Sequence, residues 1–322
     1  MTPPNWTSAA TRPEMDAGLQ YHIRCKRGDV ERYVLLPGDP ERVDLIAADW
    51  DESRLIANYR EHRTFSGKVG GVALTCCSTG AGGGSTSSAL EELAVLGGEA
   101  FIRVGTTAAL QPEIECGDIV ISSGAMRHDG TSQYYVDPAY PAVAHYAVTA
   151  ALVEAAERLG LRYHVGVSCS TASFYCGQGR PGFNGYEQAF FRDKVDDLRR
   201  AGVLNFEMEA ATIFTLASLY NLRAGAVCTV IANRITDRFV YGGIEHSVRA
   251  ANMAVRILAE WDVRLARAGK RHRYPSLPAC ASRRRAPRPS TSPTRGWCAP
   301  RRAASRGRAA CWSRAARSPR SP

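Results

Sequence analysis

The chain has 322 residues, of which 45% are hydrophobic and 22% charged, a composition that suits one large α/β domain or two small ones. Its formal net charge of +10 would fit a nucleic-acid-binding protein, but the charge is unevenly distributed. Residues 271–322 hold fourteen Arg and no acidic residue, whereas residues 1–270 hold 27 basic and 31 acidic residues, a formal charge of −4. Composition therefore argues against a basic nucleic-acid surface on the main body.

Strands and helices are expected to alternate along residues 21–270, after a loose N-terminal arm at residues 1–20. A buried strand at Tyr33–Leu36 ends in a turn, and Pro40 takes the first position of the next helix. Further strands are expected at 72–77, 101–104, 119–122, 165–170 and 224–232. Helices are expected after Ser85 to about Leu96 and at 142–159, 209–219 and 245–266, and Gly160 is the expected C-cap residue of the helix at 142–159. This alternation predicts an α/β fold, a three-layer αβα sandwich around a central mixed sheet, with the site in the loops beyond the strand ends.

The C-terminal segment, residues 271–322, is rich in Arg, Pro, Ala and Ser and shows no helical or strand periodicity. It cannot bury enough apolar surface to offset its chain entropy, so it is predicted to be disordered. Two alternatives stay open. The segment could be a polyanion-binding arm, given Trp297 and Trp312, or an out-of-frame translation of a GC-rich gene.

The ten cysteines form no CxxC pair and no cluster with His at metal-site spacing. Cys76, Cys77, Cys169 and Cys228 lie in apolar, strand-like runs and are expected to be small buried hydrophobes. This usage is typical of the reducing cytoplasm. Residues 1–20 lack the apolar core of a secretion signal, and no run of eighteen apolar residues exists. A cytoplasmic protein, neither secreted nor membrane-spanning, is expected.

Two segments have the chemistry of an anion site. Gly38 ends a strand before a helix N-terminus, and Arg42 on the first helical turn can point back at an anion bound there. Arg103 lies inside an apolar strand, where a buried guanidinium needs an anionic partner. That partner is either an internal carboxylate or a phosphate, which Thr106 would also bind. A solvated Arg42 at an ordinary strand–helix junction is the alternative for the first segment.

Two further segments suggest a sugar site and exclude a dinucleotide site. The run Gly80–Ser85 matches neither the dinucleotide fingerprint nor a P-loop, because it lacks the third Gly and the Lys, so close strand–helix packing is expected there. Glu207 and Glu209 are two residues apart and do not share a helix face. One can therefore accept hydrogen bonds from both ribose hydroxyls while the other caps a helix or faces solvent.

The segment Phe174–Arg180 has the hydrogen-bonding groups that uracil requires. Uracil presents an acceptor, a donor and an acceptor in a row: O2, N3–H and O4. The Gln178 amide can pair with the first two and the Arg180 guanidinium with the third, while Phe174 offers a flat apolar wall. By itself this pattern also fits an ordinary surface loop.

Taken together and in order, these motifs resemble the nucleoside phosphorylase superfamily, and within it the uridine phosphorylases, over about residues 20–265. The segments that carry the resemblance are Pro37–Val43, Tyr59–Glu61, Ser78–Gly83, Arg103–Thr107, Phe174–Arg180 and Asn205–Glu209. The resemblance implies a pentosyltransferase that uses phosphate to split uridine, or a related pyrimidine nucleoside, into uracil and ribose 1-phosphate. It also implies a homohexamer built from dimers, with sites shared between subunits.

The resemblance also implies residue roles. Phosphate would be bound by Gly38, Arg42, Arg103 and Thr106, with Arg60 of a neighbouring subunit. Ribose would be bound by Met208, Glu209 and a neighbour's His22, although His22 also fits an ordinary surface histidine. The base would be bound by Thr107, Phe174, Gln178, Arg180 and Arg234. No cofactor is required and phosphate is a co-substrate. Glu61 matches a position that can contribute to a potassium site between subunits.

Two rival functions remain open at this point. A purine nucleoside phosphorylase or a nucleosidase would belong to the same superfamily. Asn233 and Arg234 stand where purine-specific members have an Asp, and a nucleosidase would not need Arg42, Arg60 and Arg103 together. A polyanion-binding protein acting through its basic tail is the rival from another class.

Overall fold

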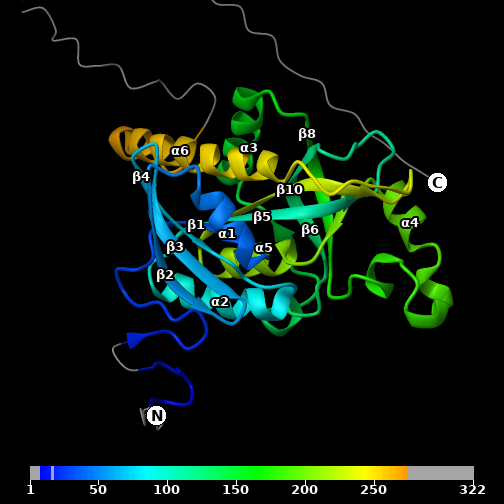
Figure 1. Cartoon of the computed structure of the whole chain (residues 1–322), viewed down its shortest axis with the longest axis horizontal. Coiled ribbons are helices and arrows are strands. Elements are labelled where there is room, and N and C mark those ends of the chain that lie inside the picture. Colours follow the sequence, from blue (N-terminus) through cyan, green and yellow to red (C-terminus); the bar gives the residue numbers. More distant parts are fainter. Residues whose placement is uncertain (1–7, 16–17, 274–322) are drawn as a thin grey trace, which may run out of the picture. The chain divides into compact units, whose positions relative to one another are not determined.

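A computed structural model describes residues 8–15 and 18–273 (Figure 1). The strands are β1 (Tyr33–Pro37), β2 (Glu52–Tyr59), β3 (His62–Val69), β4 (Val72–Cys77), β5 (Ala100–Ala109), β6 (Ile119–His128), β7 (Ala142–Val143), β8 (Tyr163–Thr171), β9 (Asn205–Glu207), β10 (Arg223–Asn233) and β11 (Arg238–Phe239). The helices are α1 (Pro40–Ala47), α2 (Gly83–Val95), α3 (Tyr146–Leu159), α4 (Lys194–Arg200), α5 (Ala210–Leu219) and α6 (Ile244–Ala268).

Helices cover both faces of the sheet, which confirms the predicted three-layer αβα fold (Figure 1). The alternation of side chains along β1 shows why both faces of the sheet are covered. Tyr33 and Leu35 pack into one apolar core with α1, α3 and α6, whereas Val34 and Leu36 pack into a second core with α2 and α5. Successive strand residues point to opposite faces, so a strand buried on both sides reads as a continuous apolar run.

The sheet is mixed, and part of it closes on itself. β1 is parallel to β4 and β5, and β5 is parallel to β10, whereas β6 is antiparallel to β10. The short strand β9 pairs with both β5 and β8, so the pairings β5–β10–β6–β8–β9–β5 form a ring. Through β9, this ring places the Asn205–Glu207 segment beside β5, which carries Arg103.

Three predicted boundaries were wrong. The strand expected to end at Ser122 continues to His128 as β6. Gly105–Thr107 was expected after a strand, but it lies within β5, because β10 pairs with β5 from Ala100 to Ala109. The helix expected from Ala142 begins at Tyr146 instead. Ala142 and Val143 pair with β6 as β7, and the Nδ1 atom of His145 caps the helix by accepting the amide of Ala147 at 3.2 Å.

The β2–β3 hairpin was not predicted from the sequence. Its two strands are antiparallel, and Arg60 and Glu61 form the turn between them, with Arg60 at a φ of 54°. The short elements β9, β11 and α4 were not predicted either. By contrast, the start of α1 at Pro40, the bounds of β4 and the left-handed C-cap at Gly160 were all confirmed.

The seven cysteines in the described ranges are all free, and Cys76, Cys77, Cys169 and Cys228 are fully buried as expected. Of the predicted N-terminal arm, residues 8–15 and 18–20 are described, and Glu14 and Gln20 form an isolated β-bridge. The predicted disordered tail lies outside the described residues from position 274 onward. Within the described part of the chain, no helix has both the length and the apolarity that a membrane span requires.

Gly225 of β10 allows α3 to pack closely against the sheet. A Cβ atom added at this position would lie 2.4 Å from Cγ1 and 3.1 Å from Cβ of Val148. Val148 is fully buried and β-branched, so it has little freedom to move aside. Close contact between α3 and β10 therefore depends on the missing side chain.

We predict that Gly225→Ala lowers the free energy of unfolding by about 1–3 kcal/mol, because it overpacks this contact. Urea denaturation at fixed protein concentration measures the change. The control is Gly84→Ala near the start of α2, where an added Cβ has no neighbour within 4 Å. Alanine favours a helix, so the control variant keeps or slightly gains stability. Equal stability of the two variants would contradict the packing argument.

Candidate active site

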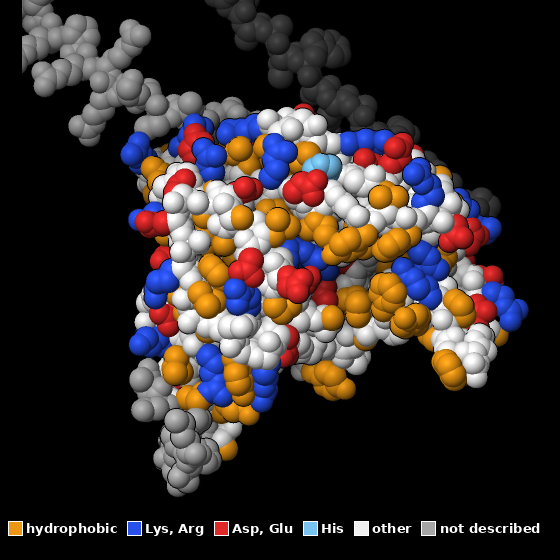
Figure 2. Space-filling view, in the orientation of Figure 1, with side chains coloured by type: hydrophobic (Ala, Val, Ile, Leu, Met, Phe, Trp, Pro, Cys, Tyr) orange, Lys and Arg blue, Asp and Glu red, His pale blue; other side chains and the backbone are white. Residues whose placement is uncertain are grey.

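A cavity of about 400 Å³ lies near the carboxyl ends of β1, β5 and β10. Figure 2 shows this hollowed face, with acidic and basic side chains surrounded by hydrophobic ones. Ten of the residues predicted from the sequence line the cavity: Gly38, Arg42, Arg103, Thr106, Thr107, Phe174, Gln178, Arg180, Met208 and Glu209. The fold therefore brings together segments that are up to about 170 residues apart in the chain.

One end of the cavity carries the positive charge of Arg42. Arg42 projects from the first turn of α1, next to Gly38 and Asp39, and its Nη1 atom donates to the carbonyl of Val104 at 3.3 Å. Among the described residues, no carboxylate forms an ion pair with Arg42. Burial lowers the pKa of Arg42, and the neighbouring charge of Arg103 lowers it further. A bound anion would relieve both effects, so this end is suited to phosphate.

Arg103 lies between two buried carboxylates. Its Nε atom donates to Oε2 of Glu207 at 2.8 Å, and its Nη2 atom lies 2.6 Å from Oε2 of Glu209. Arg103, Glu207 and Glu209 are each at most 5% exposed. The internal carboxylate partner considered from the sequence is therefore present, and Arg103 also lines the cavity. The two carboxylates hold its guanidinium in one orientation at the cavity wall.

The two glutamates of the Asn205–Glu209 segment have different environments. Glu207 accepts the amides of Glu209 at 2.9 Å and Ala210 at 2.8 Å, as well as the hydroxyl of Ser170, so it caps the start of α5. Glu209 accepts the amide of Gly82 at 2.6 Å and lines the cavity. Burial raises the pKa of Glu209, and Arg103 opposes that shift. Glu209 thus remains available to accept hydrogen bonds from sugar hydroxyls.

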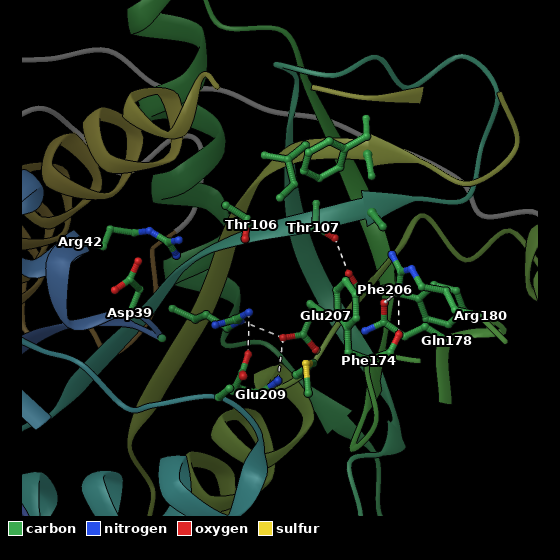
Figure 3. A pocket seen from close by; sticks show the side chains of 18 residues that line it. Asp39, Arg42, Thr106, Thr107, Phe174, Gln178, Arg180, Phe206, Glu207 and Glu209 are labelled. Atoms are coloured by element: carbon green, nitrogen blue, oxygen red, sulfur yellow. Dashed lines mark hydrogen bonds and ion pairs between the residues drawn. The ribbon is translucent and has the colours of Figure 1, made fainter. Parts of the chain in front are cut away.

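The opposite end of the cavity carries the Gln178–Arg180 pair (Figure 3). The Nη1 atom of Arg180 donates to Oε1 of Gln178 at 2.5 Å and to the carbonyl of Phe174 at 2.8 Å. The Arg180 guanidinium lies 4.0 Å from the centre of the Phe174 ring. Burial lowers the pKa of Arg180 to about 10, and Arg234 adds to this effect. With Oε1 oriented by Arg180, the amide nitrogen of Gln178 is left to donate to a ligand.

Two predicted base-binding residues are held by other groups. The hydroxyl of Thr107 donates to the carbonyl of Phe206 at 2.5 Å and accepts from Asn205 at 2.7 Å, so its hydrogen is not available to a ligand. Arg234 does not line the cavity. Its guanidinium donates to the carbonyls of Gln178 at 2.6 Å and Gly179 at 3.0 Å, and thereby supports the loop that carries the base-binding pair.

Three other predicted residues lie outside this cavity. The Nδ1 atom of His22 lies 2.7 Å from Oε1 of Glu92, and its ring stacks edge-on against Tyr21. Arg60 is exposed at the β2–β3 turn, with its guanidinium 5.5 Å from the centre of the Tyr21 ring. His22 and Arg60 thus lie around one tyrosine on the surface, apart from the site of their own chain.

Glu61 is the third of these residues, and it lies beside an oxygen-rich position. Its Oε1 atom accepts the hydroxyl of Ser85 at 2.8 Å, and hydrogen bonding lowers its pKa. Ser85 was not singled out from the sequence. Within the described ranges, no group of three or more His, Cys, Asp and Glu side chains is placed to bind a metal ion.

Several cavity residues were not predicted as site residues. Asp39, Phe206 and Glu207 lie inside motifs already identified from the sequence. The predicted site residues beside them could therefore have pointed to them. The apolar lining, apart from Ala81 in the Ser78–Gly83 segment, falls outside those motifs. It consists of Ala81, Ala108, Ile231, Ala232 and Phe239.

Comparisons with known proteins agree with this geometry. The family model described as "Phosphorylase superfamily" matches residues 32–260. A protein named uridine phosphorylase from Thermococcus kodakarensis is 58% identical over 269 residues, which cover 84% of this chain and 97% of that protein. A uridine phosphorylase from Escherichia coli is 40% identical over 243 residues, covering 74% and 95%. A guanosine phosphorylase from Halorubrum lacusprofundi is 42% identical over 216 residues, covering 67% and 84%.

These matches extend over both ends of the cavity and the strands that carry it. The family model spans more than half of the chain, and the relatives are covered over most of their own length. The chain belongs to the phosphorylase superfamily.

Proposed function

We propose that this protein catalyses the phosphorolysis of uridine to uracil and ribose 1-phosphate. The observation that carries the proposal is the order in which charged and polar groups are arranged along the cavity. An arginine without a carboxylate partner lies at one end, the Gln178–Arg180 pair lies at the other, and Glu209 lies between them (Figure 3). The uridine phosphorylase names of the relatives from Thermococcus kodakarensis and Escherichia coli support the same substrate.

The reaction follows from where the charges lie. A phosphate oxygen, oriented by Arg42, Arg103 and Thr106, attacks C1′ of the ribose while the bond from C1′ to N1 of uracil breaks. The bonding electron pair leaves with N1, so uracil departs as an anion and later takes a proton from water. Gln178 and Arg180 stabilise this anion by donating hydrogen bonds to O2 and O4, as the donors of an oxyanion hole do. Glu209 and Met208 hold the sugar while positive charge develops on it.

The proposal includes a shared site in a homohexamer of dimers. His22 and Arg60 lie outside the cavity of their own chain, so a second copy would have to supply them, the former to the sugar and the latter to phosphate. Glu61 and Ser85 would supply oxygen ligands of the kind that a potassium ion prefers. A location in the cytoplasm is part of the proposal too, and the seven free cysteines among the described residues support it.

Guanosine is the second candidate substrate, because one relative is named guanosine phosphorylase. The carbonyl and amide edge of guanine could also pair with Gln178 and Arg180. Purines commonly need a proton at N7 in order to leave, and Asn233 cannot provide it. Both ends of its amide are occupied: the nitrogen donates to the carbonyls of Gln111 and Ile114, and the oxygen accepts the amides of Ile235 and Thr236. Uridine is therefore preferred.

We predict that the enzyme releases uracil from uridine only when phosphate is present. The measurement is a panel of uridine, thymidine, deoxyuridine, inosine, guanosine and adenosine, each with and without phosphate. A chain lacking residues 274–322 should retain the activity, because the cavity lies within the described domain. Faster cleavage of guanosine, cleavage without phosphate, or loss of activity in an intact truncated domain would each support a rival.

We predict that Gln178→Ala and Arg180→Ala each lower kcat/KM for uridine about 10²–10³-fold, because each removes a group that stabilises the departing base. Phosphate affinity, measured by calorimetry, should be nearly unchanged, since the anion end of the cavity is intact. Gln188→Ala is the matched control: its amide donates to the Tyr186 hydroxyl and it does not line the cavity. Undiminished uridine cleavage in either of the two site variants would refute the uracil assignment.

We predict that two inactive variants complement each other in mixed oligomers. Arg60→Ala removes a residue offered to the neighbouring site, and Gln178→Ala inactivates the site of its own chain. In randomly mixed dimers, half are hybrids, and each hybrid has one intact site, so co-expression should restore about a quarter of the wild-type activity. Activity no higher than that of the separate variants, in oligomers shown to be mixed by mass spectrometry, would place Arg60 in its own subunit's site or outside the mechanism.

A further inference from the structure

The backbone of the base-binding loop is held by three cationic side chains. Lys194, at the first position of α4, donates through Nζ to the carbonyl of Gly177 at 2.6 Å. Arg234 donates to the next two carbonyls, those of Gln178 and Gly179, and Arg180 donates to the carbonyl of Phe174. Three consecutive carbonyls, of residues 177–179, therefore accept hydrogen bonds from positively charged groups.

Lys194 was given no role by the sequence, and its surroundings are unusual for a lysine. It is partly buried, and its ammonium lies 5.1 Å from the centre of the Phe191 ring. No acidic side chain in the described part of the chain forms an ion pair with it. Burial lowers the pKa of Lys194. Its charge opposes the rise in the pKa of Cys169 and contributes to the lowered pKa of His128. Lysines are rarely buried without a carboxylate partner, so this position needs an explanation.

The place of Lys194 in the fold puts its charge behind the base end of the cavity. Cys169 of β8 is paired in register with Phe206 of β9, which lines the cavity. The next residue of α4, Val195, packs against Gly179: a Cβ atom added at Gly179 would lie 3.1 Å from Cγ2 of Val195. The start of α4 therefore touches the loop on both sides of Gln178.

We propose that Lys194 is a positioning residue that fixes Gln178 and adds positive potential where the nucleobase leaves as an anion. The proposal rests on the phosphorolysis of uridine proposed above. Among the described residues, no carboxylate forms an ion pair with Lys194, Arg180 or Arg234. The charge of Asp237 acts on Arg234, so Lys194 and Arg180 supply the positive charge that is left at this end of the cavity. A partly buried site weakens solvent screening, which lets a charge act across the loop. Such a field favours a base that departs as an anion and disfavours one that must be protonated before it departs.

The test compares two nucleosides whose bases differ as leaving groups. Fluorine at C5 withdraws electrons, so the anion of 5-fluorouracil needs less stabilisation than that of uracil. Single-turnover rates are measured with saturating phosphate. We expect Lys194→Met to slow uridine cleavage about tenfold and 5-fluorouridine cleavage no more than about threefold. Lys194→Arg, which restores the charge and the donor, should recover most of the uridine rate.

The control is Lys68→Met, which removes a lysine paired with Glu52 on the β2–β3 hairpin and should affect neither nucleoside. Lys194→Gln, which is neutral but polar, provides a second variant if Lys194→Met folds poorly. Equal losses on both nucleosides, or no loss on either, would overturn the electrostatic role. Failure of the wild-type enzyme to cleave uridine would instead overturn the proposed function, so the two failures are distinguishable.

Discussion

The buried cluster of Arg103, Glu207 and Glu209 is the interaction on which the site depends. Placing one guanidinium between two carboxylates in the sheet is costly, because all three groups lose water. Once they are in place, removing Arg103 would leave two buried carboxylates without their cation, at a cost of about 3–5 kcal/mol. The cluster ties β5 to β9 and the start of α5, and all three of its residues line the cavity. A structural network and a ligand site thus share the same atoms.

Charge is distributed along the cavity in the order that nucleoside cleavage requires. Positive charge at the phosphate end neutralises the charge of the nucleophile. A carboxylate beside the sugar stabilises the positive charge that develops there, and positive charge at the base end stabilises the departing anion. At the base end of the cavity, positively charged hydrogen-bond donors have two different roles. Arg180 can contact the ligand, whereas Arg234 and Lys194 hold the backbone that presents Gln178. This division explains why several cations gather in a loop that has no carboxylate partner for them among the described residues.

The local pattern of the sequence was sufficient for most of the fold. Apolar runs identified the central strands, and the Pro40 and Gly160 signals identified a helix start and a helix end, because these features depend on a few neighbouring residues. The β2–β3 hairpin was missed because β2 is largely exposed and the buried positions of β3 are mostly polar (His62, Thr64 and Ser66), so neither strand shows an apolar alternation. The length of β5 was missed because it is set by pairing with β10, more than a hundred residues away.

The sequence by itself determined the chemical types in the site: arginines for an anion, a carboxylate for a sugar and a Gln–Arg pair for a pyrimidine. Motif order and spacing carry that information without coordinates. Only the tertiary structure decided how these groups are used. It assigned Glu207 to the helix cap and Glu209 to the cavity, turned the Thr107 hydroxyl toward the backbone, and made Arg234 and Lys194 supports of the base-binding loop. Each of these outcomes depends on which buried donor forms a hydrogen bond with which acceptor, and long-range strand pairing determines those partners.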